Sequence, residues 1–441
     1  TKLISRHVAE VEVERGTACG GTCESCEACV FQNRIRAEAV NKVSALPGQK
    51  VVIESKTSDV LGAAALLYLV RNVRRFTPLK KLAEKSHAAG WLVASAAVLL
   101  PLGVCFALWG AMNALIILLH LALFGLLADL VCRVIGKLRK KRFARNYAGL
   151  AALLLTVAYL SVGWYQACHV WRTAYTVTTG KAVGQLRVGL IADSHIGTTF
   201  DGAGFAAHMK TLRAEKPDVV VVAGDFVDER SSRADMVAAC KALGGLETPY
   251  GVYFVFGNHD KGNYSGGHAG QTPDGIRKAG KRSGLMPDRD FTAEDLVNEL
   301  EANGVTVLQD ETVLLDDRFY LIGRQDASEE TENRGGRASM QELTQGLNEQ
   351  YYSIVLDHQP HDYDGEAASG VDLVLSGHTH GGQLIPLVQL IDWFGFGDDN
   401  VYGLERRADT DFVVTSGISD WAISFKTGCR SEYVILDIQG S

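Results

Sequence analysis

Three long apolar runs near the middle of the chain constrain its fold more than any other feature. They cover residues 91–112, 114–135 and 148–167, and each is close to the ~20 residues that a helix needs to cross the hydrocarbon core of a bilayer. The runs carry few charges, and Asp129 lies inside the second. Core helices of a soluble protein are the alternative, but these rarely run so long without a polar face. The sequence therefore predicts three transmembrane helices.

The positions of Lys and Arg predict the direction in which these helices cross. Residues 71–85 and 133–145 are rich in both, and such loops stay on the cytoplasmic side of a membrane. The short connection 110–113 is then external, and the third span leads to an extracytoplasmic region. The apolar run 60–70 is below spanning length, although the orientation would reverse if it crossed. We expect a multi-pass protein of the bacterial cytoplasmic membrane, in contact with the lipid bilayer.

Length and charge bound the rest of the chain. Its 441 residues suggest two or three domains, which we expect as a cysteine-rich domain at 1–57, a membrane region at 58–178 and a catalytic domain at 179–441. The formal net charge of −7 and the pI of about 6.0 give no reason to expect nucleic acid as a partner.

Beyond the apolar runs, short β-branched segments alternate with helical patterns, which is typical of an α/β fold. The expected buried strands cover residues 186–192, 218–223, 252–256, 353–356 and 372–376. The expected helices between them cover residues 204–215, 232–243 and 293–303. Antiparallel or edge strands are expected at residues 312–315, 319–322, 411–415 and 432–438.

Each of the five expected buried strands is followed by residues of the types that can bind metal ions. In chain order these residues are Asp193 and His195, then Asp225 and Asp228, then Asn258, His259 and Asp260, then His358, and last His378 and His380. Open α/β sheets place their sites at these carboxyl ends. Carboxylate, amide and imidazole groups suit Mn, Fe, Zn or Mg and exclude a thiolate site. A single Asp at a strand end usually forms a turn, but five such ends in succession predict a metal centre. A carboxylate such as Asp225 can bridge two ions about 3.5–4 Å apart.

These motifs, read as Asp-x-His, Gly-Asp-x-x-Asp, Gly-Asn-His-Asp, a later His and Gly-His-x-His, resemble the calcineurin-like metallophosphoesterases. The preceding apolar runs make residues 89–441 similar to the bacterial transmembrane branch of that family. The resemblance implies a four-layer α/β/β/α sandwich. It also implies hydrolysis of phosphoric esters by water that two divalent metal ions activate.

The resemblance further implies a role for each motif residue. The residues that would hold one ion are Asp193, His195 and His380. Those that would hold the other are Asn258, His358 and His378, with Asp225 bridging the two. His259 would donate to the scissile phosphate or protonate the leaving oxygen. Asp228 and Asp260 would orient ligands or loops around the centre, although Asp260 is equally well explained as a cap or turn residue.

Two segments near the motifs bear on the substrate. Residues 262–289 form a Gly-rich, basic insertion that is either a cap for an anionic substrate or a solvated loop. Residues 384–388 and 391–396 are strongly apolar and either border an acyl-binding surface or pack in the core. We expect a phosphomonoester, phosphodiester or pyrophosphate of a lipid, an envelope component or a small molecule. The alternative is a UDP-2,3-diacylglucosamine-type pyrophosphate hydrolase of lipid A synthesis, a cytoplasmic route that conflicts with the predicted orientation.

Four cysteines crowd into one short stretch near the start of the sequence, at Cys19, Cys23, Cys26 and Cys29. Short strands are expected on either side, at 8–13 and 51–54, so the domain would be small and β-rich. Residues 5–70 resemble the cytoplasmic domain of the RseC family, which implies electron-transfer proteins as partners. The thiolates would bind an Fe–S cluster or zinc, or form two reducible disulfides. A second hypothesis follows, in which the chain is a redox-linked membrane regulator with a non-catalytic phosphoesterase domain.

Overall fold

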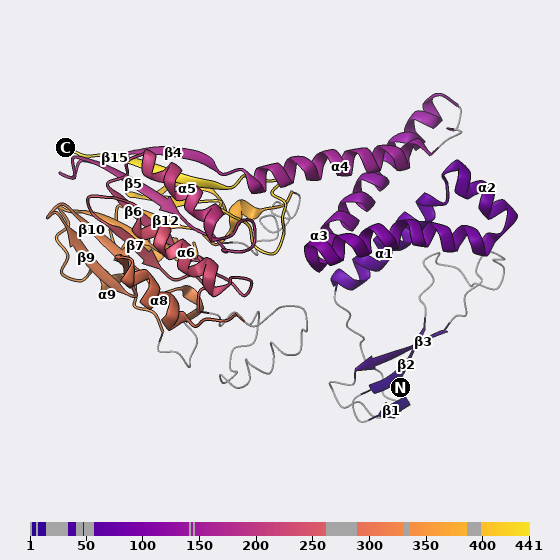
Figure 1. The fold of residues 1–441 in the computed structure, drawn as a ribbon, viewed down its shortest axis with the longest axis horizontal. Coiled ribbons are helices and arrows are strands. Elements are labelled where there is room, and N and C mark those ends of the chain that lie inside the picture. Colours follow the sequence, from indigo (N-terminus) through magenta and orange to yellow (C-terminus); the bar gives the residue numbers. More distant parts are fainter. Residues whose placement is uncertain are drawn as a thin grey trace. The chain divides into compact units, whose positions relative to one another are not determined.

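The chain divides into two compact units, Thr1–Tyr68 and Leu69–Ser441, which Figure 1 traces along the sequence. The computed structural model describes residues 2–5, 8–14, 34–40, 47, 57–140, 143, 146–261, 289–329, 336–385 and 398–441. The first unit contains an antiparallel sheet of order β1-β2-β3, formed by β1 (Lys2–Ser5), β2 (Val8–Glu14) and β3 (Arg34–Val40). The expected strand at 8–13 is β2. The four clustered cysteines and the expected strand at 51–54 lie outside the described residues.

Two of the helices that the structure describes are long and apolar enough to cross a membrane, α3 (His87–Leu138) and α4 (Tyr147–Cys168). Helix α3 covers the first two predicted spans, and its backbone leaves the helical conformation near the end of the first, at Gly110, with φ 82° and ψ 174°. Helix α4 covers the third predicted span. The shorter run at 60–70 lies in α1 (Thr57–Val73), and α2 (Thr77–Lys85) follows it. The count of three spans stays a prediction.

The charge inside the second apolar run has a partner. Asp129 is buried in the second half of α3, and both of its carboxylate oxygens accept hydrogen bonds from the Arg75 guanidinium, at 2.8 and 2.9 Å. An isolated carboxylate on an apolar helix would be costly. The pairing therefore explains how this helix tolerates Asp129, and it fixes the basic segment before α2 against α3.

The part of the chain after α4 forms two sheets. The first has the order β4-β15-β5-β6-β7-β8 and the second the order β13-β14-β12-β11-β10-β9. The strands of the first sheet are β4 (Trp171–Thr178), β5 (Gln185–Ile191), β6 (Val219–Ala223), β7 (Val252–Val255), β8 (Val305–Val307) and β15 (Glu432–Gln439). Those of the second are β9 (Glu311–Leu315), β10 (Phe319–Gly323), β11 (Tyr352–Leu356), β12 (Leu373–Ser376), β13 (Gly403–Arg407) and β14 (Thr410–Val414).

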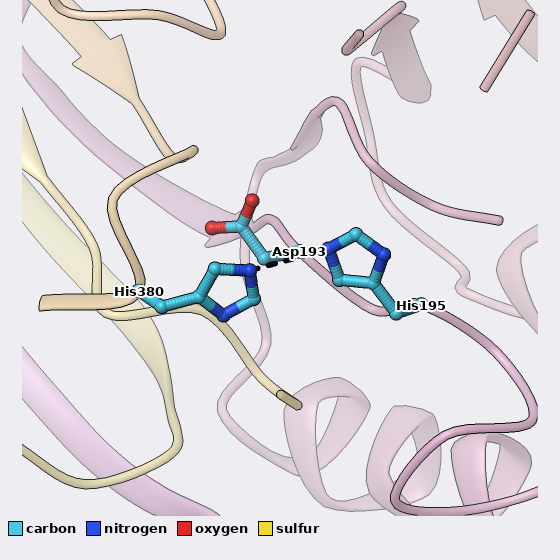
Figure 2. Close-up of side chains that lie close together, drawn as sticks. All are labelled: Asp193, His195 and His380. Carbon is cyan, nitrogen blue, oxygen red and sulfur yellow. Dashed lines mark hydrogen bonds between the residues drawn. The ribbon is translucent and has the colours of Figure 1, made fainter. Parts of the chain in front are cut away.

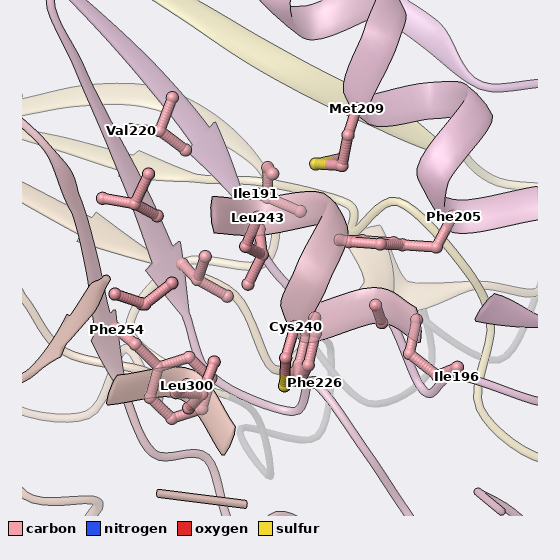
Figure 3. Close-up of a cluster of buried hydrophobic side chains, with 14 of the residues drawn as sticks. Ile191, Ile196, Phe205, Met209, Val220, Phe226, Cys240, Leu243, Phe254 and Leu300 are labelled. Atoms are coloured by element: carbon pink, nitrogen blue, oxygen red, sulfur yellow. The ribbon is translucent and has the colours of Figure 1, made fainter. Parts of the chain in front are cut away.

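Hydrophobic clusters show that the two sheets are stacked and covered by helices. Along β6, Val220 and Val222 face an outer cluster, whereas Val219 and Val221 face the cluster between the sheets, as the period of two in a strand requires. Figure 3 shows the outer cluster, where Phe205 meets the strands. The helices of this outer layer are α5 (Gly202–Ala214), α6 (Arg233–Gly244) and α8 (Ala293–Ala302). The other outer layer contains α9 (Met340–Thr344) and α10 (Tyr363–Ala368). The structure thus has the predicted α/β/β/α layers.

All five predicted buried strands are confirmed, as β5, β6, β7, β11 and β12. The four strands expected to be antiparallel or at an edge are also confirmed, because β9, β10, β14 and β15 each have an antiparallel neighbour. No clear signal in the sequence marks β4, β8 or β13. Strand β8 has only three residues, and β4 and β13 are half-exposed, so they lack the continuous apolar run that marks a buried strand.

A short connection joins helix α4 to the first sheet. Only His169 and Val170 separate the end of α4 from the start of β4. The backbone N–H of Trp171 then donates to Ser431 O (2.8 Å), and the Ser431 hydroxyl donates to Ala167 O (2.8 Å). The last turn of α4 is therefore bound to the segment that leads into β15.

Candidate metal centre

The predicted ligand residues meet where the carboxyl ends of the parallel strands converge. Strands β5, β6 and β7 run parallel in the first sheet, and β11 and β12 run parallel in the second. Because the two sheets are stacked, the loops that follow these strands face one another. The residues on these loops are Asp193 and His195 after β5, Asp225 after β6, Asn258 after β7, His358 after β11, and His378 and His380 after β12.

One group of potential ligands consists of Asp193, His195 and His380. All three are buried, and one ligand atom from each lies within 4.8 Å of the others. The Nε2 atoms of His195 and His380 are 3.2 Å apart, as Figure 2 shows together with the Asp193 carboxylate. These are the three residues expected to hold one ion.

The second group consists of Asp225, His358 and His378, again with ligand atoms within 4.8 Å of one another. Asn258 belongs with them, because its Oδ1 lies 3.2 Å from His358 Nε2 and 3.0 Å from His378 Nδ1. The Oδ2 atom of Asp225 is 3.2 Å from His358 Nε2 and 3.6 Å from His195 Nε2. Asp225 therefore lies between the two groups, in the position of a bridging ligand.

Oxygen atoms close to Nδ1 orient three of the imidazoles. His195 Nδ1 lies 3.4 Å from Asp228 Oδ2, His358 Nδ1 is 2.7 Å from Ala223 O, and His380 Nδ1 is 3.3 Å from Ser419 O. Carbonyl and carboxylate oxygens only accept hydrogen bonds, so these oxygens favour a proton on each Nδ1 and turn each Nε2 toward the other ligand atoms. Metal-binding histidines are commonly oriented in this way.

Electrostatics also favours cations at the centre. Burial raises the pKa of Asp193 to about 6. Burial acts in the same direction on Asp225, but His358 and His195 hold the pKa of that carboxyl well below its usual range. Burial and His358 lower the pKa of His378 to about 4, and burial and His195 lower that of His380. His378 and His380 are therefore neutral near pH 7, which is the form that binds metals.

The residues present fit two divalent cations. The Asp193 Oδ2 atom is buried and has no hydrogen-bond partner among the residues that the structure describes. A buried carboxylate oxygen without a partner carries a large desolvation penalty, and a cation would offset it. The oxygen and imidazole donors match Mn, Fe, Zn or Mg.

The backbone around the centre is strained and tightly packed. Five of the residues have positive φ angles, namely Asp193, His195, Asp225, His378 and His380. Such conformations cost about 1–3 kcal/mol each and concentrate at functional sites. Glycines allow the close approach, because a Cβ on Gly257 would lie 2.2 Å from Asp225 Oδ1 and one on Gly377 would lie 2.8 Å from Asp193 Oδ2.

Asp228 and Asp260 support the centre from outside the two groups. Asp228 faces His195 and also accepts a hydrogen bond from the Thr198 hydroxyl at 3.2 Å. Asp260 is fully buried and accepts from the backbone N–H groups of Phe226, Val227 and Gly257. Asp260 therefore holds the loops after β6 and β7 together.

His259 lies beside the centre without belonging to either group. Its backbone N–H donates to Asp225 Oδ1 at 2.9 Å. Its buried ring packs against His195 and Trp421, with centroid separations of 5.2 and 5.3 Å. This position agrees with a role on the substrate side of the metal ions.

Sequence reasoning missed a buried ion pair in the loop between β14 and β15. Lys426 is fully buried, and its Nζ donates to Ser416 O (2.7 Å) and Ser419 O (2.8 Å) and faces the buried Asp420 carboxylate at 3.4 Å. Ser419 O is the acceptor for His380 Nδ1. The available signal in the sequence was the motif Ser-Gly-x-Ser-Asp at residues 416–420. Like the metal-binding motifs, it places polar residues directly after a strand.

A third group of potential ligands, His361, His378 and Asp398, was also missed. It shares His378 with the centre, and His361 Nε2 lies 3.1 Å from Asp398 Oδ1. His361 is exposed, and exposed groups of this kind are common without an ion. The insertion at 262–289 lies outside the described residues except for Arg289, and so do the apolar residues 386–388 and 391–396.

Comparison with known proteins agrees with this centre. Residues 186–382 match the family model described as calcineurin-like phosphoesterase. Residues 2–74 match the model described as positive regulator of sigma(E), RseC/MucC. A transmembrane protein with metallophosphoesterase domain from Bos taurus is 27% identical over 72% of this chain and 68% of its own length. The uncharacterized metallophosphoesterase YkoQ of Bacillus subtilis is 28% identical over 50% of this chain and 73% of its own.

Solved structures similar to the chain include a dimetal phosphatase from Danio rerio, with 14% identity and a TM-score of 0.31 over 52% of this chain and 86% of that one. Another is TT1561 of Thermus thermophilus, with 12% identity and a TM-score of 0.30 over 53% of this chain and 89% of that one.

Replacing the bridging carboxylate tests the centre. We expect Asp225→Asn, which keeps the shape but removes the charge, to reduce bound Mn from two ions per chain to one or none. Metal-dependent hydrolysis should fall by about 10³-fold or more. Metal analysis of desalted protein measures the first effect, and Asp364→Asn on the exposed side of α10 is the control. Two bound ions in the Asp225→Asn variant would contradict the bridging role.

The buried lysine gives a second prediction. Lys426→Met leaves the Asp420 carboxylate buried without its cation, so we expect unfolding free energy to fall by about 3–5 kcal/mol. The double variant Lys426→Met, Asp420→Leu removes both charges and should recover much of that loss. Denaturant unfolding of the purified chain measures both, with Lys210→Met on the exposed face of α5 as the control. Equal losses in single and double variants would show that the pair is not the source of stability.

Proposed function

Residues 186–382 belong to the calcineurin-like phosphoesterases, a family of metal-dependent phosphoric ester hydrolases, and on that premise we propose that the chain is a membrane-anchored phosphoesterase with a binuclear metal centre. Its ligands would be Asp193, His195 and His380 on one side and Asn258, His358 and His378 on the other, with Asp225 shared. The observation that carries this proposal is the position of Asp225, whose Oδ2 lies within 3.6 Å of a histidine from each group.

The residues of the chain orient the metal-binding histidines and supply the proton that the leaving oxygen needs. Two divalent ions, when bound, supply Lewis acidity that activates water and stabilises charge on the phosphoryl oxygens. Asp228 holds His195 with its Nε2 toward the centre, and the carbonyl of Ala223 does the same for His358. Hydrolysis forms a bond between water oxygen and phosphorus and breaks the bond to the leaving oxygen. That oxygen needs a proton unless it is already a weak base.

His259 is the residue proposed to supply that proton. Its backbone is anchored on Asp225, and its Nδ1 lies 3.6 Å from Glu229 Oε1. An imidazole in this position can act as a general acid toward a leaving oxygen. Trp421 packs against the ring and limits its movement.

Three observations support membrane anchoring with the catalytic domain outside. Helices α3 and α4 are apolar and carry many exposed large side chains. The side chain of Asn113, beside the break at Gly110, accepts from Ser424 N at 2.8 Å and donates to its hydroxyl at 3.4 Å. These contacts support a connection 110–113 and an end of α4 on the same side of the membrane as the catalytic domain. The basic residues Arg133, Lys137 and Arg139 lie at the opposite end of α3.

The proposed position beside a membrane supports a substrate class. A site beside a bilayer is suited to a phosphorylated lipid or an envelope-related phosphoester. The cytoplasmic lipid A reaction requires the opposite orientation, and a purely regulatory, non-catalytic domain would not need a full set of ligand residues. The N-terminal RseC/MucC segment supports a link to electron-transfer proteins, with Cys19, Cys23, Cys26 and Cys29 as the proposed Fe–S, zinc or redox-active residues.

Substitution of His259 separates proton donation from metal binding. We expect His259→Ala to keep its metal ions and to hydrolyse a phenyl phosphodiester about 10²–10⁴-fold more slowly. A p-nitrophenyl diester should be affected much less, because p-nitrophenolate leaves without a proton. Rates with both esters and metal content are the readouts, and His208→Ala on α5 is the control. Loss of metal in the His259→Ala variant would instead make His259 a ligand.

Reporter fusions test the orientation. Alkaline phosphatase fused after Val170 should be active, because that enzyme folds only outside the cytoplasm. A green fluorescent reporter fused after Lys140 should fluoresce, because Arg139 and Lys140 lie in the basic connection that is expected inside. An inactive phosphatase after Val170 together with a non-fluorescent reporter after Lys140 would show that the orientation is the opposite one.

A further inference from the structure

A cavity of about 540 Å³ lies beside the metal centre, between α3, α4 and two loops of the catalytic domain. Its walls are mostly apolar and include Trp109 and Ile117 from α3 and Leu160 and Trp164 from α4. Its size is typical of a site for a small molecule, about 300–1,000 Å³. The candidate membrane helices thus supply a hydrophobic cavity to the catalytic domain.

The other end of the cavity is polar and reaches residues that contact the metal-binding histidines. Thr198, Thr199 and Asp420 line this end. Thr198 donates to Asp228, which orients His195, and the Thr199 hydroxyl accepts from Asp420 N at 3.3 Å. A ligand that fills the cavity therefore has its polar end beside residues that contact the metal-binding His195.

Charge at this polar end is balanced. The buried Asp420 carboxylate faces the Lys426 ammonium at 3.4 Å, so the cavity does not present an unpaired negative charge to an anionic ligand. The loop that carries both residues is bound to α4, because Lys426 N donates to Gly163 O (3.0 Å) and Gln166 Nε2 donates to Lys426 O (2.9 Å). These hydrogen bonds fix the position of helix α4 relative to the polar end of the cavity.

From this arrangement, and resting on the proposed function, we infer that the substrate is a membrane lipid whose hydrocarbon chain enters between α3 and α4 while its phosphoester reaches the metal centre. An apolar chain and a phosphoester on one molecule match the two ends of the cavity. The chain would come directly from the surrounding bilayer, because side chains on both helices that face away from the protein are apolar and exposed. Examples are Leu108 at 69% and Leu154 at 60% exposure.

Two chromogenic esters with the same scissile bond test the inference. The full chain in nanodiscs with Mn is given p-nitrophenyl methyl phosphate or p-nitrophenyl dodecyl phosphate, and kcat/KM is measured for each. We expect the dodecyl ester to be preferred by at least about tenfold, since apolar pockets discriminate on that scale. The substitution Ser161→Trp places a large side chain in the cavity from α4. It should remove that preference and leave the methyl ester unchanged.

The matched control is Val162→Trp, on the next residue of α4, which is 58% exposed and lies outside the cavity. It should behave as the unaltered chain with both esters. If the unaltered chain does not prefer the dodecyl ester, or if Ser161→Trp slows both esters equally, the inference is wrong.

Direct binding separates this inference from the proposed function. Should neither ester be hydrolysed with any divalent metal, the phosphoesterase proposal fails. Saturable binding of dodecyl phosphate to the same nanodiscs then decides the inference. Binding that is at least about tenfold weaker in Ser161→Trp than in Val162→Trp supports the chain site, and equal binding in the two variants overturns it.

Discussion

The Asp225 carboxylate is the point on which the two halves of the site depend. It is fully buried at the end of β6 and lies within 3.6 Å of His195 from one group and of His358 from the other. Asp193 and Asp260 are buried in the same region, and burial raises the pKa of each to about 6. So much buried negative charge is unfavourable without cations. Bound metal ions would therefore stabilise the fold as well as the reaction, and this would offset the cost of the several positive φ angles in the loops.

A second constraint connects this centre to helix α4. The loop between β14 and β15 carries Ser419, whose carbonyl orients His380. It also carries Lys426, whose ammonium donates hydrogen bonds to carbonyl oxygens of the same loop. The same loop is hydrogen-bonded to the last turns of α4 through Gly163 and Ala167. Because one loop contacts both the metal centre and α4, the position of the helix and the shape of the site are linked.

The sequence was most informative where one local pattern decides the structure. The run Val219–Ala223 predicts a buried strand, and a ligand residue after each such strand predicts the centre, so the residues that gather there could be named in advance. Asp420 and Lys426 could not be identified, because their partners are brought together only by tertiary packing and a Lys in a loop is usually exposed. The left-handed backbone at His378 and His380 is likewise imposed by the surrounding fold and not by residue type. The half-exposed strands β4 and β13 lacked the apolar pattern altogether.

The central claim is that two metal ions share Asp225, and electron paramagnetic resonance of the Mn-loaded chain tests it most directly. Two Mn(II) ions about 3.5–4 Å apart with a common carboxylate interact magnetically, so we predict the multiline spectrum of a spin-coupled pair at saturating Mn. The spectrum should revert to that of isolated Mn(II) in Asp225→Asn. An isolated Mn(II) spectrum from the unaltered chain at two bound ions per chain would contradict the account.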